Sequence, residues 1–215
     1  MQQYGDPLSL DPALASRGGL KLWHALDCFQ LDVTGLRAAD LGCSTGGFTD
    51  TLLRRGAASV IAVDTAYGQL AYRLRQDERV DVRERTNALH AEPPADGVDL
   101  VVLDLSWTRQ RLAVPTALRW LRRDGQRPPQ IISLIKPHYE LDRPTFTEHA
   151  VGGVLPEDIG ERTTRDVIES LGELGVECLG LTKSPVLGGA VGRKKSKARG
   201  GGNAEWLALL QPAAS

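Results

Sequence analysis

Short apolar runs alternate along the chain with segments whose apolar residues recur at helical spacing. The runs are bounded by glycine or polar turns and lie at residues 36–41, 58–63, 98–103 and 131–135. The segments with helical spacing are 20–29, 48–55, 67–75, 110–123 and 157–174. Runs this short and apolar are typical of parallel strands buried on both faces. The pattern therefore predicts an α/β fold in which helices cover a mostly parallel sheet.

Three further strands complete the predicted sheet, at 80–85, 176–182 and 204–210. We expect the last strand to run antiparallel to the others, which brings its first residues to the edge where the parallel strands end. Residues 138–155, with the pair Gly152-Gly153, are expected to form a long loop beside that edge. The whole pattern predicts a seven-stranded sheet with its functional groups gathered at one edge.

A length of 215 residues suits one α/β domain and is short for two. The prolines and glycine of residues 1–15 predict a loosely attached N-terminal arm. The domain itself is expected to span 16–215 and to carry a basic, glycine-rich loop at 188–203.

The turn after the first predicted strand carries the main functional signal. It reads Asp40-Leu41-Gly42-Cys43-Ser44-Thr45-Gly46-Gly47 and leads directly into a helix. The free N–H groups and positive dipole end of that helix face any ligand above the turn. A second acid, Asp64, follows the next strand, roughly 20 residues on, where such folds hold a ribose. Together these features predict a nucleoside site.

The spacing of the glycines bears on which nucleoside binds. A dinucleotide site needs the spacing G-x-G-x-x-G. In this turn the next glycine after Gly42 is Gly46, so the spacing does not match. An acid at residue 40 repels a pyrophosphate but suits a cationic, amine-bearing ligand such as S-adenosylmethionine. A turn without a ligand and a dehydrogenase site remain open alternatives at this point.

Four charged residues are expected to meet at the same edge of the sheet. Asp104 and Lys136 each follow a buried strand, Lys21 lies near the start of the first helix, and Glu205 opens the last strand. A lysine at the end of an inner strand is costly to bury without a partner, and a cation at a helix start is unfavourable without a facing anion. An ordinary surface position remains the alternative for Lys21.

This arrangement suits methylation of an alcohol, which needs a base to take the hydroxyl proton. Lys136 is the candidate base, with a pKa lowered by burial and by Lys21, while Asp104 and Glu205 hold the two lysines. Two other methyl acceptors are disfavoured. The sequence Asp104-Leu105-Ser106-Trp107 lacks the Pro-Pro-aromatic turn used on adenine amines, and no cysteine follows the fourth or fifth strand to attack a pyrimidine.

The charge of the chain is unevenly distributed. Residues 183–203 hold six cations and no acid although the whole chain has a net charge of −1, which leaves −7 on the remainder. A basic stretch on an acidic body indicates a polyanionic partner, with a solvated loop as the alternative. The three cysteines and four histidines have no metal-ligand spacing. No signal peptide or membrane span is evident, so we expect a cytoplasmic protein that binds neither metal nor membrane.

Six motifs together resemble the hemolysin-A-like (TlyA) branch of the FtsJ-type RNA 2′-O-methyltransferases. They are Ser16-Arg17-Gly18-Gly19-x-Lys21-Leu22, Asp40-Leu41-Gly42-x-Ser44-Thr45-Gly46-Gly47-Phe48-Thr49, Tyr67-Gly68-Gln69-Leu70, Glu84-Arg85-Thr86-Asn87, Asp104-Leu105-Ser106 and Leu134-Ile135-Lys136-Pro137. The resemblance covers residues 16–210 and implies a Rossmann-like fold, S-adenosylmethionine as methyl donor, and a ribose hydroxyl of ribosomal RNA as acceptor. It also implies a catalytic Lys-Asp-Lys-Glu tetrad at Lys21, Asp104, Lys136 and Glu205.

The resemblance also extends the set of expected binding residues. Those expected at the cofactor are Asp40, Gly42, Ser44, Gly46, Gly47, Phe48, Asp64, Asn87 and Asp104. Asn87 is equally readable as a plain turn residue. Those expected at RNA are Arg17, Arg193, Lys194, Lys195, Lys197 and Arg199.

Two departures from the branch affect the expected function. Its members usually carry a small RNA-binding domain before the methyltransferase, where this chain has only its N-terminal arm, and the basic run at 193–199 resembles an insertion that partly replaces that domain. A small-molecule hydroxyl methyltransferase and a non-catalytic RNA-binding or membrane-active protein are kept as alternatives. The oligomeric state is left open.

Overall fold

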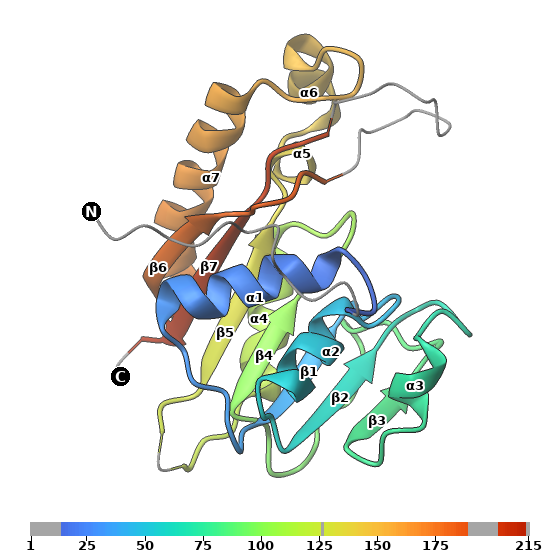
Figure 1. Ribbon diagram of the computed structural model, residues 1–215. Helices are drawn as coiled ribbons and strands as arrows, with labels where there is room; N and C mark the ends of the chain where they lie inside the picture. Colours follow the sequence, from blue (N-terminus) through green and yellow to red (C-terminus); the bar gives the residue numbers. More distant parts are fainter. Residues whose placement is uncertain (1–13, 126, 189–201, 214–215) are drawn as a thin grey trace.

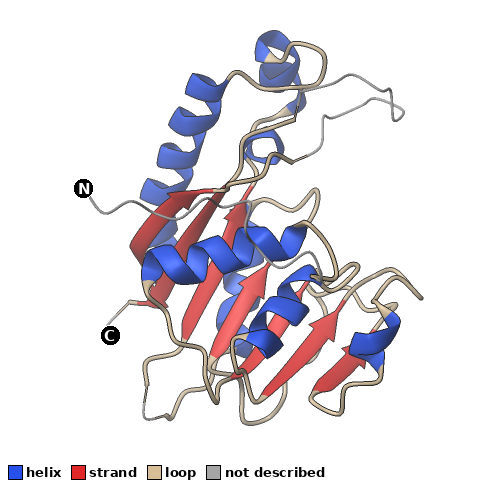
Figure 2. Cartoon of the chain, in the orientation of Figure 1, coloured by secondary structure: helices blue, strands red, loops and turns tan. Residues whose placement is uncertain are grey.

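A seven-stranded sheet runs through the protein with helices on both faces (Figure 1; Figure 2). The structure is a computed structural model and describes residues 14–125, 127–188 and 202–213. The strand order across the sheet is β3-β2-β1-β4-β5-β7-β6. The strands are β1 (Arg37–Leu41), β2 (Ser59–Val63), β3 (Val80–Arg83), β4 (Leu100–Leu103), β5 (Gln130–Ile135), β6 (Val176–Lys183) and β7 (Trp206–Pro212).

The direction of the last strand decides what gathers at the functional edge. Strands β1 to β5 pair in parallel, whereas β7 pairs antiparallel with both β5 and β6. The prediction of a mostly parallel sheet with an antiparallel last strand is confirmed. In this register Trp206 of β7 lies beside Ile135 of β5, so the residues just before β7 and just after β5 are brought together.

The helices form two layers. On one face α1 (Gly18–Phe29) and α2 (Gly47–Arg54) pack together, while α4 (Gln110–Trp120) and α7 (Glu157–Leu171) cover the other face (Figure 1). The shorter helices are α3 (Tyr72–Arg75), α5 (Pro137–Glu140), α6 (Arg143–His149) and a 3₁₀ turn at Gly172–Leu174.

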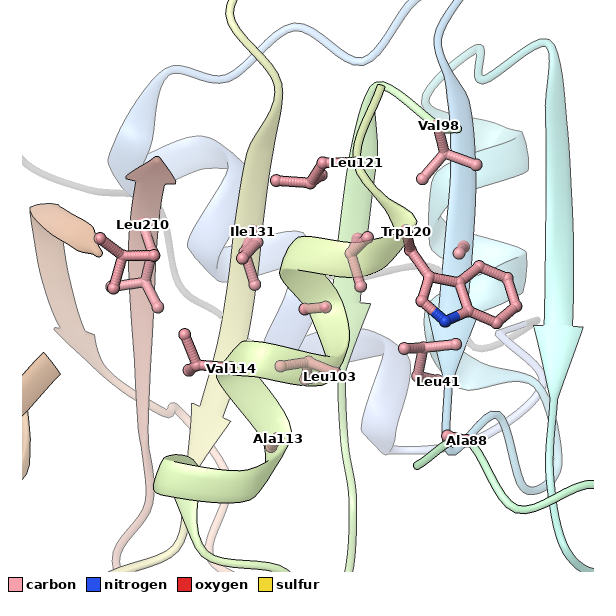
Figure 3. Close-up of a cluster of buried hydrophobic side chains, with 14 of the residues drawn as sticks. Leu41, Ala88, Val98, Leu103, Ala113, Val114, Trp120, Leu121, Ile131 and Leu210 are labelled. Carbon is pink, nitrogen blue, oxygen red and sulfur yellow. The ribbon is translucent and has the colours of Figure 1, made fainter. Parts of the chain in front are cut away.

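Each helical layer encloses its own apolar core. Successive residues of β1 alternate between the two cores, with Ala38 in the core under α1 and α2 and Ala39 in the core under α4. The indole of Trp120 is fully buried in the second core, among side chains such as Leu41 and Val98 (Figure 3). Because both faces of the inner strands are buried, the strands read as continuous apolar runs rather than alternating ones.

The predicted helix at 67–75 is wrong over most of its length, since only Tyr72–Arg75 is helical. The residues before it form a turn that contains Gly68 at φ +74°. Glu84 holds this turn by accepting a hydrogen bond from the Gly68 amide at 2.9 Å and by pairing with Arg75. A tertiary carboxylate therefore overrides the local helical pattern.

The prediction of a long loop at 138–155 is wrong in part. The segment forms α5 and α6, and a β-bridge joins Val151 to Val154. Asp142 caps α6, because its carboxylate accepts a hydrogen bond from the Thr145 amide at 2.8 Å. The short helices were hidden by prolines at 137 and 144, which are tolerated in a first helical turn.

Candidate active site

The turn after β1 lies where the strand order reverses, between β1 and β4, which is where open parallel sheets bind ligands. Gly42 has φ +97°, and a Cβ atom placed on it would lie 2.5 Å from the backbone oxygen of Asp104. Only glycine fits this close approach. Beyond it, the Ser44 amide donates to the Asp64 carboxylate at 2.8 Å, so the ends of β1 and β2 are tied together.

A cleft of about 400 Å³ opens above these strand ends. Five residues expected at the cofactor line it: Gly42, Ser44, Asp64, Asn87 and Asp104. A second cavity of about 110 Å³ adjoins it and shares Gly42, Ser44 and Asp104. Gly47 and Phe48 line this smaller cavity. Seven of the nine expected residues therefore lie on one continuous region of surface.

The remaining two expected cofactor residues line neither cavity. Asp40 is fully buried, and its Oδ2 accepts hydrogen bonds from the Thr49 amide at 2.9 Å and the Thr49 hydroxyl at 2.6 Å. It therefore holds the first turn of α2. The Cα of Gly46 faces Leu70 and Leu74, where an added Cβ would collide with their side chains. The expectation of direct contact with a ligand in the cleft does not fit the placement of either residue.

Asn87 combines both of the interpretations left open by the sequence. Its Oδ1 accepts a hydrogen bond from the Leu89 amide at 3.0 Å, as in a turn, while the residue also lines the cleft. The turn contact fixes the side chain at the cleft wall.

The four charged residues of the expected tetrad form two ion pairs. Lys136 Nζ lies 2.5 Å from Asp104 Oδ1, and Lys21 Nζ lies 2.5 Å from Glu205 Oε2. Both lysines are about nine-tenths buried, and Glu205 is only 3% exposed. The negative partner that a cation near the start of α1 requires is thus Glu205, 184 positions away in the sequence. Since the charges of Glu205 and Asp104 both act on Lys136, the two pairs form one site.

The protonation of Lys136 differs from the expectation. Burial lowers the pKa of the Lys136 ammonium, but the charge of Asp104 and its hydrogen bond outweigh burial, with a further contribution from Glu205. The net pKa is therefore raised, and the expected lowering is wrong for this structure. Lys21 is itself paired with Glu205, so its positive charge is largely compensated.

Two aromatic rings, those of Trp107 and Tyr139, lie against each other beside the tetrad. Trp107 is 74% exposed, has φ +61° and lies with its ring centroid 4.7 Å from that of Tyr139. His138 is buried next to them, and burial together with the charges of Lys136 and Lys21 lowers its pKa to about 4. The ring is therefore neutral near pH 7. Tyr139 and His138 were not predicted at the site, and their positions just after Lys136 were the available signal.

Gly188 and Asn203, which flank the undescribed part of the expected basic loop, lie beside Glu205. The Gly188 amide donates to the Asn203 carbonyl at 2.8 Å, and a side chain at Gly188 would collide with the Glu205 carboxylate. Asn203 is 1% exposed and accepts from the Leu155 amide at 2.8 Å. The expected RNA-binding residues Arg193, Lys194, Lys195, Lys197 and Arg199 lie outside the described residues. Arg17, also expected at RNA, is exposed just before α1.

The sequence of this chain matches that of a known protein family. The sequence profile described as FtsJ-like methyltransferase matches residues 14–196, which include Lys21, Asp104 and Lys136. This chain belongs to the FtsJ-like methyltransferase family. The match ends before Glu205, so the fourth member of the tetrad lies outside the matched range, directly before β7.

Curated relatives of this FtsJ-like chain include proteins named as methyltransferases of ribosomal RNA. It is 42% identical over 179 residues to the 16S/23S rRNA (cytidine-2′-O)-methyltransferase TlyA of Mycobacterium tuberculosis. The aligned region covers 82% of this chain and 64% of the relative. It is 38% identical over 188 residues to YqxC of Bacillus subtilis, covering 86% and 63%. The chain therefore spans less than two thirds of the length of these relatives.

Two solved structures of similar sequence share the fold of this chain. A protein from Streptococcus thermophilus that carries the name hemolysin superposes with a TM-score of 0.81 at 34% identity, covering 99% of this chain and 70% of the other. A similarly named protein from Lactococcus lactis gives 0.79 at 34% identity, covering 94% and 89%. The Rossmann-like methyltransferase fold expected from the sequence is confirmed.

Within residues 14–125, 127–188 and 202–213, no three His, Cys, Asp or Glu side chains meet as metal ligands. None of the helices in this part of the chain has the length and apolar character needed to cross a bilayer.

Proposed function

We propose that this protein transfers a methyl group from S-adenosylmethionine to a ribose 2′-hydroxyl of RNA, with ribosomal RNA as the substrate. The observation that supports it most directly is Asp104, which lines the cofactor cleft and also pairs with Lys136. A single side chain thus joins the donor cavity to the candidate base. The names of the TlyA relatives and the family favour this chemistry, and such a substrate implies a cytoplasmic protein.

The residues present fit S-adenosylmethionine. The donor carries a positive charge, and three carboxyl groups, Asp40, Asp64 and Asp104, surround the glycine turn. Asp64 and Asn87 would hold the nucleoside in the larger cavity, with Gly42 admitting it close to the backbone. Gly47 and Phe48 would line the remaining, smaller cavity. When bound, this cofactor supplies an electrophilic methyl group.

The tetrad would prepare the hydroxyl for transfer. Lys136, in its neutral amine form, takes the hydroxyl proton as the ribose oxygen becomes a nucleophile. Asp104 fixes the position of Lys136 and stabilises the ammonium that results. Lys21, held by Glu205, places a second positive charge beside the acceptor oxygen as negative charge develops on it. The neutral ring of His138 adds no further positive charge to oppose proton uptake by Lys136.

Cationic residues around the site would bind the RNA backbone. Arg17 is exposed at the start of α1, the helix that carries Lys21. The cluster Arg193, Lys194, Lys195, Lys197 and Arg199 belongs to a segment whose two ends, at Gly188 and Asn203, lie close to Glu205. Phosphate contacts of this kind position an RNA without reading its sequence.

One assay tests the proposal. The purified protein is incubated with donor labelled in the methyl group and with ribosomal subunits, total RNA or a metabolite extract. We expect label in RNA, as methylated riboses that resist alkaline cleavage. Lys136→Arg serves as the matched variant, because arginine keeps the charge but cannot act as a base. Label only in small molecules, or full activity of Lys136→Arg, would refute it.

A further inference from the structure

Asp40 occupies an unusual place for a carboxyl group. It is fully buried near the end of β1, and β1 lies between β2 and β4 in the sheet. Asp64 follows β2 and Asp104 follows β4, so two further carboxyl groups flank it at the same sheet edge. Both of them raise the pKa of Asp40 through their charge.

Asp104 has a cationic partner and both oxygens of Asp64 accept hydrogen bonds, whereas one oxygen of Asp40 has no partner among the described residues. Asp104 is paired with Lys136, and Asp64 accepts hydrogen bonds from the amides of Ser44 and Ala66 at 2.8 and 2.7 Å. In Asp40, Thr49 binds only Oδ2, and the buried Oδ1 has no hydrogen-bond partner among the described residues. A proton on Oδ1 would remove an uncompensated charge from the interior.

The ionisation of Asp40 is therefore finely balanced. Its pKa is raised to about 7, because burial and the charges of Asp104 and Asp64 together outweigh the opposing hydrogen bonds from Thr49. The other titratable group facing it is Cys43, whose pKa is raised by burial and by these acids, so the thiol stays protonated. Asp40 can therefore gain or lose a proton near neutral pH.

We propose that Asp40 is a charge-selective positioning residue that loses a proton when the cationic donor binds and regains it when the neutral product remains. This inference rests on the proposed use of S-adenosylmethionine. A positive charge in the cleft favours the Asp40 carboxylate, which in turn holds the donor more tightly. Methyl transfer turns the sulfonium into a neutral sulfide, so the attraction disappears and Asp40 takes up a proton. The site thereby prefers donor over product without direct contact.

The test measures proton release on binding. Titration calorimetry at pH 6.5 in two buffers of different ionisation enthalpy gives the number of protons released by S-adenosylmethionine and by S-adenosylhomocysteine. We expect the wild-type protein to release about 0.5–1 more proton with the donor than Asp40→Asn does, and no such difference for the product. The ratio of donor to product affinity should rise with pH by up to about tenfold per unit and level off above pH 7. In Asp40→Asn this dependence should be lost.

Asp50→Asn is the matched control. Asp50 is also buried, on α2, but it is paired with Arg54 and Arg73, so its replacement should leave the proton count unchanged. The carbon-13 signal of the Asp40 carboxyl, titrated in the wild-type protein with and without donor, gives a second measurement that needs no variant. Tight donor binding with equal proton counts for donor and product would overturn this inference alone. Failure of the donor to bind would overturn the proposed function with it.

Discussion

Lys136 Nζ and Asp104 Oδ1 lie 2.5 Å apart, and the lysine is only 9% exposed. Burial alone would favour a neutral amine, but the carboxylate more than offsets it, so the pKa of Lys136 is raised. The candidate base therefore rests as an ammonium. A second cation in the cleft would compete with Lys136 for Asp104 and lower that pKa again. Donor binding and activation of the base are thus linked through one carboxylate.

This pair predicts a shift in the pH dependence of methyl transfer. A base works when it is deprotonated, so the single-turnover rate should rise as pH increases through the pKa of Lys136. Asp104→Asn removes the main group that raises this pKa, and the rising limb should therefore move to lower pH. Glu205→Gln should give a smaller shift, since Glu205 contributes less. An unmoved limb in Asp104→Asn would show that another group is titrating.

The same pair predicts the result of removing the base. Lys136→Ala should lower the transfer rate by about 10²–10⁴-fold, the usual value of general-base assistance. Donor affinity should be retained, because Lys136 lines neither cavity at the glycine turn. Single-turnover rates and calorimetric donor binding separate the two effects. Loss of donor binding in Lys136→Ala would instead indicate a role in holding the cofactor.

The sequence was sufficient to predict the sheet and the gathering of the tetrad. Strands buried on both faces leave long apolar signals, and the carboxyl ends of parallel strands share one edge, which places Asp104 beside Lys136. The antiparallel last strand then brings Glu205 to Lys21. These outcomes depend on strand direction and on the packing of α1, which carries Lys21, against β7.

What the sequence could not predict depends on tertiary partners. Glu84 binds the Gly68 amide and holds the residues before Tyr72 in a turn instead of the expected helix. Asp40 accepts a hydrogen bond from Thr49 and does not face the cleft. The raised pKa of Lys136 follows from which acid it pairs with. A local sequence pattern identifies the charged residues of the site but does not indicate which carboxylate each lysine contacts.

Gly42 should be far less tolerant of a side chain than another glycine with similar backbone geometry. An added Cβ at Gly42 would lie 2.5 Å from the Asp104 carbonyl oxygen, whereas Gly35, at φ +75°, has nothing within 4 Å. Gly35→Ala should cost about 1–2 kcal/mol from backbone strain alone. Gly42→Ala adds a clash with the backbone that carries Asp104, so its denaturation midpoint should be clearly lower and donor binding should weaken. Equal midpoints for the two variants would contradict this.

The basic cluster should govern how RNA binding depends on salt. Replacing Arg193, Lys194, Lys195 and Lys197 with alanine should weaken binding to all RNA sequences alike, because phosphate contacts carry no sequence information. The slope of log affinity against log salt should fall by up to about 3 for single-stranded RNA. Filter binding at several salt concentrations measures it, with donor binding as the control for folding. An unchanged slope would remove the cluster from the RNA site.

Asp40 should make the free protein less stable as pH rises. Its folded pKa of about 7 lies above its ordinary value, so the stabilising protonated form is complete at low pH and is lost as pH rises toward 7. Asp40→Asn keeps an oxygen for Thr49 and cannot ionise. Its melting temperature relative to wild type should increase between pH 5 and pH 7, by roughly 5 °C or more, and stay constant above that. Saturating donor should reduce the gain, because a cation in the cleft stabilises the wild-type carboxylate. A constant difference in melting temperature between Asp40→Asn and wild type over the whole pH range would show that Asp40 is ionised at every pH tested.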